Sequence, residues 1–132
     1  MDQFEEGQKI ASRYIILRKL GRGGMGEVYL VEDTTCGEQR ALKTLRSKYL
    51  KSNHAKARFV REATTARQLT HPGIVTIYDT GNWEDTLFYT MDYVDGKSLR
   101  QWMHQRGRLD IGPTVRILCL VADALVHAHR LT

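Results

Sequence analysis

The stretch Gly21-Arg22-Gly23-Gly24-Met25-Gly26-Glu27-Val28 decides the fold of this chain. It fits the pattern Gly-x-Gly-x-x-Gly-x-Val, which alone is a weak signal for a nucleotide-binding turn. A dinucleotide-binding fold would continue into a helix, and a P-loop would end in Gly-Lys-Ser or Gly-Lys-Thr. Residues 27–31 are instead typical of a strand. The pattern therefore predicts a glycine turn between two antiparallel strands, whose backbone N–H groups can approach phosphate oxygens closely.

Apolar patterns on both sides of this turn predict further strands and three helices. Helical spacing of apolar residues between positions 52 and 70 predicts an amphipathic helix capped by Ser52 or Asn53. A short helix capped by Ser98 and stopped by Gly107 follows, and then a long helix from Pro113 to His129. The strands are expected at residues 14–20, 27–31, 39–45, 74–78 and 87–93, with residues 80–85 as the last turn. The order predicts an α+β fold: a five-stranded antiparallel sheet with one inserted helix, then helices only.

Size and composition are those of a soluble globular protein. The chain has 132 residues, of which 42% are hydrophobic and 27% charged, enough for one compact domain. No apolar stretch reaches the roughly 18 residues of a membrane span, and the acidic N-terminus does not resemble a secretory signal. We therefore expect a cytoplasmic protein. The two cysteines, Cys36 and Cys119, suggest neither a disulfide framework nor a metal site.

Positive charge is concentrated in one segment. The net charge is +5, but residues 40–67 hold nine Lys and Arg against the single acid Glu62, a net of +8. Such a segment attracts phosphate, which could belong to a nucleic acid, a nucleotide or a phosphorylated loop. A solvated helix face is an equally reasonable interpretation.

Two charged residues could supply what a glycine turn lacks. Lys43 follows Ala41 by two positions, so the two side chains share one face of their strand. Glu62 lies on the predicted helix and could form an ion pair that holds the Lys43 ammonium toward phosphates. Taken singly, each residue would be assigned to the solvent-exposed surface.

In combination, these features resemble the eukaryotic-like serine/threonine protein kinases of bacteria. The resemblance extends from about Tyr14 to Thr132. It rests on the order and spacing of the glycine turn, Ala41-Leu42-Lys43, Phe59-Val60-Arg61-Glu62, His71-Pro72-Gly73-Ile74-Val75 and Met91-Asp92-Tyr93-Val94-Asp95-Gly96. It implies an extension at residues 1–13, a kinase N-lobe and hinge at 14–94, and the start of a helical C-lobe at 95–132.

The resemblance also implies roles in binding ATP. Lys43 would contact the α- and β-phosphates and pair with Glu62, these two being the catalytic residues that the sequence contains. Met91 would be the gatekeeper, Asp92 and Val94 would hydrogen-bond adenine through the backbone, and Ser98 would lie near the ribose. Phosphates would be covered by Gly21, Arg22, Gly23, Gly24, Met25 and Gly26, and the adenine ring enclosed by Leu20, Val28, Ala41 and Tyr93.

The catalytic half of the kinase pattern is absent from the sequence. No His-Arg-Asp and no Asp-Phe-Gly occurs, so neither a catalytic Asp nor a Mg²⁺ ligand is assigned. We expect this chain alone to be inactive, Mg²⁺ to belong to the complete kinase, and the exposed last helix to favour self-association. Three interpretations stay open: a portion of an active kinase that phosphorylates proteins, a natural non-catalytic module that binds a nucleotide or partner, and, remotely, a basic nucleic-acid-binding module.

Overall fold

The computed structural model describes residues 4–23, 26–45 and 47–131, and these form two compact units. The first unit comprises Met1–Gln68 and Thr76–Tyr93. The second comprises Leu69–Val75 and Val94–Thr132. The domain boundaries expected from the sequence, at residues 13 and 94, stay predictions.

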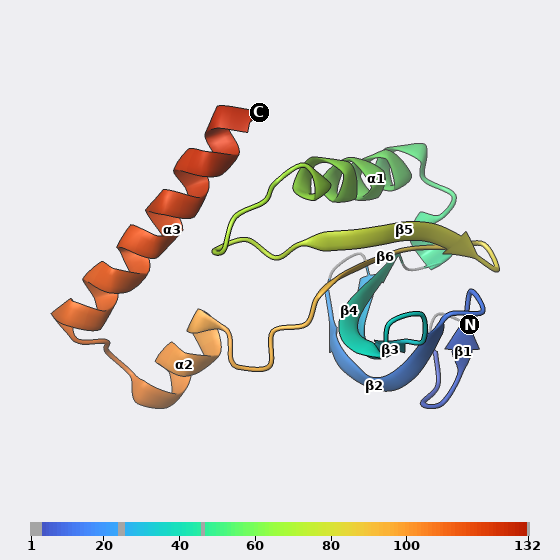
Figure 1. The fold of residues 1–132 in the computed structure, drawn as a ribbon, viewed down its shortest axis with the longest axis horizontal. Coiled ribbons are helices and arrows are strands. Elements are labelled where there is room, and N and C mark those ends of the chain that lie inside the picture. Colours follow the sequence, from blue (N-terminus) through green and yellow to red (C-terminus); the bar gives the residue numbers. More distant parts are fainter. Residues whose placement is uncertain (1–3, 24–25, 46, 132) are drawn as a thin grey trace. The chain divides into compact units, whose positions relative to one another are not determined.

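A six-stranded antiparallel sheet forms most of the first unit. Its strand order is β1-β2-β3-β4-β6-β5, so β6 lies between β4 and β5. Figure 1 shows that β2, β3 and β4 curve strongly and that α1 runs along β5. The elements are β1 Lys9–Ile10, β2 Tyr14–Arg22, β3 Gly26–Asp33, β4 Glu38–Leu45, the 3-10 helix Ser47–Tyr49, α1 Asn53–Arg67, β5 Ile77–Trp83 and β6 Thr86–Asp92. The α+β fold is confirmed, but the expected number of strands, five, was one too low.

The additional strand, β1, lies in the segment that was expected to be a plain extension. Lys9 pairs with Ile15 and Ile10 with Tyr14, across a tight turn in which Ala11 and Ser12 have positive φ values of 52° and 55°. Neither residue favours the left-handed region, so no turn signal was visible in the sequence. Burial of Ile10 explains why this short strand forms.

Strand β5 corresponds to the fourth predicted strand, which was expected at residues 74–78 and is found at Ile77–Trp83. Inner and outer positions alternate along it, and its polar residues lie mainly on the outer side. The polar stretch 80–85 looked like a turn, whereas most of it is the solvated face of a terminal strand of the sheet. The real turn consists of Glu84 and Asp85, both with positive φ as in the two-residue turns that suit hairpins.

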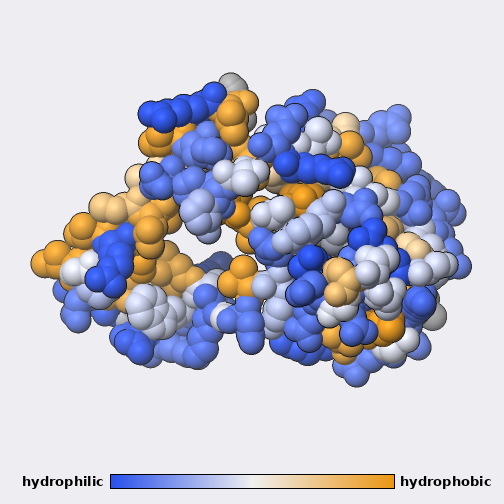
Figure 2. Space-filling view, in the orientation of Figure 1, coloured by the Kyte–Doolittle hydropathy of each residue, from blue (hydrophilic) through white to orange (hydrophobic). Residues whose placement is uncertain are grey.

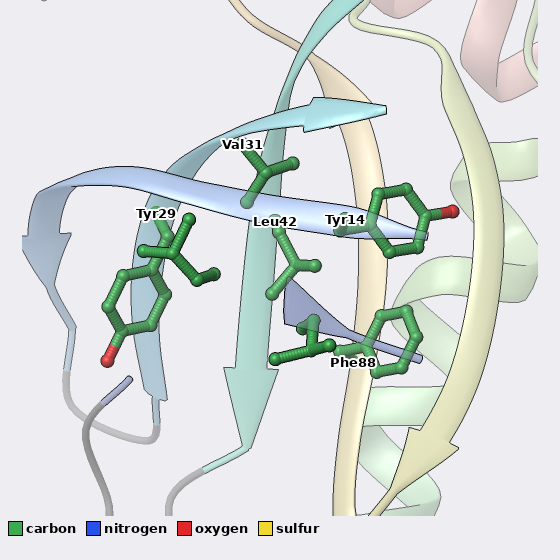
Figure 3. Close-up of a cluster of buried hydrophobic side chains, with 7 residues drawn as sticks. Tyr14, Tyr29, Val31, Leu42 and Phe88 are labelled. Carbon is green, nitrogen blue, oxygen red and sulfur yellow. The ribbon is translucent and has the colours of Figure 1, made fainter. Parts of the chain in front are cut away.

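The sheet has a separate hydrophobic cluster on each face. Figure 3 shows Tyr14, Tyr29, Val31, Leu42 and Phe88 gathered inside the curled sheet, where Ile10 and Ile16 complete the cluster. On the other face, Phe59 and Ala63 of α1 pack against Leu45, Ile77 and Tyr89. Each large side chain buried in this way contributes roughly 1.5–3 kcal/mol.

Helix α1 begins where the sequence predicted. Ser52 is the N-cap, and its hydroxyl oxygen accepts a hydrogen bond of 3.1 Å from the Ala55 N–H. Ala55, Phe59 and Ala63 recur every four residues and are the buried face of the helix. The opposite face carries the basic residues into solvent, which leaves Glu62 near the border between the two faces.

An ion-pair network ties the ends of three strands together. The Arg13 guanidinium donates two hydrogen bonds, of 2.9 and 2.8 Å, to the Asp33 carboxylate and a third, of 2.9 Å, to Asp79. Thr35 donates two more to Asp33 through its N–H and hydroxyl. The hydrogen bonds from Arg13 outweigh burial and hold the pKa of Asp33 well below its usual range.

This network should make the stability of the first unit depend on pH. Because the folded-state pKa of Asp33 is depressed, its contribution is complete above the unfolded value of about 4 and is lost as the pH falls further. We expect Asp33→Asn to lower the free energy of unfolding by about 1.5–3 kcal/mol at pH 7, since a charge-assisted pair is lost. Urea unfolding between pH 7 and pH 2.5 measures this. The difference from wild type should shrink below pH 4, and Glu38→Gln, which removes one negative charge at an exposed position of β4, is the control.

The second unit contains two helices, α2 Leu99–Arg106 and α3 Ile111–Leu131. Ser98 caps α2 and forms a reciprocal capping box with Gln101, and Gly107 ends the helix at a φ of 73°, so both predicted signals are confirmed. The long helix begins two residues before Pro113. Figure 2 shows hydrophobic residues gathered on the surface of this unit. On α3 they include Ile111, 82% exposed, and Leu118, 61% exposed.

The segment before β5 packs against α3 within this unit. His71 Nδ1 accepts a hydrogen bond of 2.8 Å from the Gly73 N–H, so its Nε2 carries the proton and donates to Asp123 at 2.9 Å. The His71 ring also contacts His127, with centroids 5.1 Å apart. By length and hydropathy alone α3 could cross a membrane, a test that core helices of soluble proteins also pass.

Candidate nucleotide-binding site

The Lys43 and Glu62 side chains meet in the first unit as the sequence suggested. Lys43 lies on β4 and Glu62 on α1, and the Lys43 Nζ is 3.0 Å from Glu62 Oε1. Their side chains are 29% and 56% exposed, so water screens this pair and its own contribution to stability is small. The pair fixes the position of the ammonium group, which is what a site for a phosphate group requires.

Tyr89 is a third member of this cluster that sequence reasoning missed. Its hydroxyl donates a hydrogen bond of 2.6 Å to Glu62 Oε1, the same oxygen that Lys43 contacts. Tyr89 lies directly opposite Lys43 in the β4–β6 ladder, so the two side chains share a face. The alternation of residues 87–93 could have placed Tyr89 on the face of Met91, but no sequence signal gives the register between strands that are distant along the chain.

This cluster shifts the pKa values of two of its groups. Burial tends to raise the pKa of Glu62, but the hydrogen bonds from Tyr89 and Lys43 outweigh it and hold this pKa below its usual value. Burial and the Glu62 carboxylate together raise the pKa of the Tyr89 hydroxyl. Glu62 is therefore ionised and Tyr89 neutral at pH 7, so the carboxylate can hold a lysine and a phenol at once.

We expect Tyr89→Phe to loosen the Lys43–Glu62 pair without unfolding the sheet. The ring still fills its place beside Phe59, whereas Glu62 loses one of two hydrogen bonds to a single oxygen. The free energy of unfolding should fall by about 1 kcal/mol. NMR titration of the Glu62 carboxyl should show its pKa rising toward the ordinary value. A pKa unchanged from wild type would contradict the role of Tyr89, and Tyr93→Phe serves as the matched control.

The glycine turn ends beside this cluster. Gly21 and Arg22 close β2, Gly26 opens β3, and the Gly23 N–H donates a hydrogen bond of 2.8 Å to the Gly26 carbonyl. Gly24 and Met25 lie outside the described residues. A Cβ on Gly26 would lie 1.8 Å from the Thr44 carbonyl oxygen, so only glycine fits here. A small pocket joins turn and cluster and is lined by Gly26, Lys43, Thr44, Arg58, Phe59 and Glu62.

The strand register places the predicted apolar residues on the face of Lys43. Val28 lies opposite Lys43 across β3–β4, and Ala41 lies opposite Met91 across β4–β6. Residues that lie directly opposite in a ladder share a face, so Val28, Ala41 and Met91 all lie on the side of the sheet that carries Lys43. This apolar surface beside a fixed ammonium suits a ligand with a flat ring and phosphates.

The remaining predicted site residues lie at the end of β6 or after it, except Leu20 on β2. The Asp92 N–H donates to the Thr76 carbonyl, its carboxylate accepts from Thr76 and Tyr78, and the Tyr93 hydroxyl accepts from Arg18. Val94 and Ser98 belong to the second unit, where Val94 is exposed and Ser98 caps α2. Leu20 lies on β2 beside the glycine turn. The roles assigned to these residues stay predictions.

Residues for a metal ion do not come together in the part of the chain that the structure describes. It holds no group of three His, Cys, Asp or Glu side chains arranged for one. Glu62, the acid nearest the pocket, is already engaged by Lys43 and Tyr89. In the described part of the chain, the carboxylate beside this pocket is therefore not available as a Mg²⁺ ligand.

Comparisons with known proteins agree with this geometry. A family model described as "Protein kinase domain" matches residues 14–132. The chain is 40% identical over 124 residues to the serine/threonine-protein kinase PrkC of Bacillus subtilis, covering 94% of this chain and 19% of that protein. It is 45% identical over 116 residues to the serine/threonine-protein kinase PknD of Mycobacterium tuberculosis, covering 88% of this chain and 18% of that protein.

A solved structure also shows similarity to a kinase domain. The crystal structure of the Mycobacterium tuberculosis PknI kinase domain superposes with a TM-score of 0.83 at 36% identity, covering 97% of this chain and 51% of that chain. The chain thus spans about a fifth of the length of the curated relatives and about half of a solved kinase domain.

Proposed function

The chain belongs to the protein kinase family, and from that premise we propose that it binds ATP on the face of the sheet that carries Lys43. It would form the ATP-binding portion of a serine/threonine protein kinase, the name that its curated relatives carry. The activity proposed for the complete kinase is transfer of the γ-phosphate of ATP to Ser or Thr of a protein.

One observation carries this proposal: the Lys43 Nζ lies 3.0 Å from Glu62 Oε1 beside a pocket that reaches Gly26. An ammonium held by a carboxylate can contact the α- and β-phosphates without having to be ordered at the moment of binding. The N–H groups of the glycine turn would add hydrogen bonds to phosphate oxygens. Bound ATP supplies the phosphoryl group, and the residues named here bind and orient it.

Further residues would hold the adenine base and the ribose of ATP, and their roles are part of the proposal. Val28, Ala41 and Tyr93 would enclose the adenine, with Leu20 on the β2 side. The Asp92 C=O and the Val94 N–H would form hydrogen bonds with the edge of the adenine ring. Met91 would be the gatekeeper beside that ring, and Ser98 would lie near the ribose. Because the sequence contains neither His-Arg-Asp nor Asp-Phe-Gly, we expect binding without phosphoryl transfer by this chain alone.

A titration of the chain with ATP, ADP and adenosine tests the proposal. We expect saturable binding, with NMR amide shifts at Gly23, Val28 and Lys43 that are larger for ATP than for adenosine. The alternative function, nucleic-acid binding, is tested in the same titration by adding a single-stranded oligonucleotide as a competitor of ATP. Shifts confined to the exposed basic face of α1, and reversed by the oligonucleotide, would instead favour nucleic-acid binding by residues 40–67.

A further inference from the structure

A β-bulge in β2 lies next to the glycine turn. Lys19 lies opposite Tyr29 and Arg22 opposite Glu27, with a register shift between Lys19 and Gly21. In a regular strand, residues three apart point to opposite faces. The bulge resets the alternation, so Lys19 and Arg22 both lie on the face of Glu27 and Tyr29. This face is opposite to the one that carries Lys43.

Glu27 is a fully buried carboxylate between these two cations. It is 0% exposed, and its Oε1 lies 3.3 Å from Lys19 Nζ and 3.7 Å from Arg22 Nε. These are ion pairs without a well-aligned hydrogen bond, because Oε1 has no hydrogen-bond partner among the described residues. A buried carboxylate costs several kcal/mol unless it is paired, so Glu27 depends on both cations. In turn it holds the last part of β2 against β3.

The other carboxylate oxygen connects Glu27 to the N-terminal segment. The Tyr29 hydroxyl donates a hydrogen bond to Glu27 Oε2 and accepts one of 3.1 Å from the Phe4 N–H. The Phe4 ring contacts Tyr29 and Trp83, with centroids 5.5 and 5.7 Å apart. A continuous chain of contacts therefore runs from Phe4 through Tyr29 and Glu27 to Arg22, the last residue of β2.

We propose that Glu27 is a positioning residue for the glycine turn: its buried carboxylate holds Lys19 and Arg22 of β2 from the face opposite the nucleotide, and Tyr29 links it to the N-terminal segment. Glu27 does not touch the nucleotide. It acts by fixing where β2 ends, and therefore where the N–H groups of the turn point. The inference rests on the proposed function, since a fixed turn matters only if that turn binds phosphate.

The ion pair with Glu27 also determines where the Arg22 side chain points. Its guanidinium is directed at Glu27, so what Arg22 offers a phosphate is its backbone N–H. Positive charge for the phosphates then comes from Lys43, on the other face. Loss of Glu27 would release two cations beside the turn and remove the contact that fixes it.

The test compares Glu27→Gln with Tyr29→Phe in the full chain. The control is Asp33→Asn, which removes the charge of another buried carboxylate at the far end of β3. We expect Glu27→Gln to raise the ATP dissociation constant by about 3–10-fold and that for adenosine by less than about twofold. Exchange of the Gly23 amide, measured without nucleotide, should become about tenfold faster because its hydrogen bond to Gly26 opens more often. Asp33→Asn should leave both the ATP-to-adenosine ratio and Gly23 exchange unchanged.

Three results would overturn the inference. They are unchanged exchange of the Gly23 amide in Glu27→Gln, tighter ATP binding by that variant, and a change of the ATP-to-adenosine affinity ratio in Asp33→Asn that equals the change in Glu27→Gln. If the wild-type chain binds neither ATP nor adenosine, the proposed function fails, and Gly23 exchange still decides the role of Glu27. Should Glu27→Gln not fold, Tyr29→Phe gives the same readouts. It keeps the carboxylate but removes the hydroxyl that donates to Glu27 Oε2 and accepts from the Phe4 N–H, so the same changes are expected at smaller size.

Discussion

Lys43→Met should weaken the binding of ATP to this chain by about 10–100-fold, the loss expected when a charge-assisted contact to a phosphate disappears. Met has a similar volume to the apolar part of Lys, so the β4 strand and its packing are kept. Adenosine has no phosphates, and its affinity should change little. Isothermal titration with both ligands measures the effect, and thermal melting confirms that the variant is folded.

The control for Lys43→Met must separate a specific contact from general attraction by the basic segment. Lys51→Met removes the same charge from an exposed position within residues 40–67. If that attraction explained binding, the two variants would lose similar affinity and both would respond similarly to salt. Equal losses, or unchanged ATP affinity in Lys43→Met, would refute the role assigned to Lys43.

Gly26→Ala should destabilise the first unit by about 3 kcal/mol or more. The added Cβ would lie 1.8 Å from the Thr44 carbonyl oxygen and 3.0 Å from its carbon. Both atoms belong to the backbone of β4, so no side-chain rotation relieves the overlap. The strands must separate at the place where Gly26 pairs with Leu45, which opens the sheet beside Lys43.

Gly21→Ala is the matched control for Gly26→Ala. A Cβ at Gly21 would meet nothing within 4 Å, so its free energy of unfolding should stay close to that of wild type. Urea unfolding monitored by far-ultraviolet circular dichroism compares the two variants. Equal stability would mean that β3 and β4 are not in the close contact described here.

The sequence predicted those parts of the fold that depend on local signals. Ser52 and Ser98 as helix caps and Gly107 as a helix end rest on side-chain and backbone preferences that act within a few residues. The glycine turn was placed correctly between two strands because a strand pattern follows it directly. The Lys43–Glu62 pair was a hypothesis from the strand face and the predicted helix that the resemblance also implied, and the structure places the two side chains in contact.

What the sequence could not predict depends on contacts between distant segments. Strand β1 and the true start of β5 depend on burial against the rest of the sheet, so local polarity was misleading. The roles of Tyr89 and Glu27 follow from strand register and from the bulge near Gly21, neither of which leaves a signal in a single sequence.

The packing of Phe4 on Trp83 has a spectroscopic consequence. The chain has two tryptophans, and each compact unit contains one: Trp83 in the first and Trp102 in the second. The indole of Trp83 lies against Phe4, whereas that of Trp102 has the Arg106 guanidinium over its ring. Intrinsic fluorescence therefore provides one natural reporter per unit. A chain that retained only Trp83 would signal by its emission when the N-terminal segment leaves the sheet.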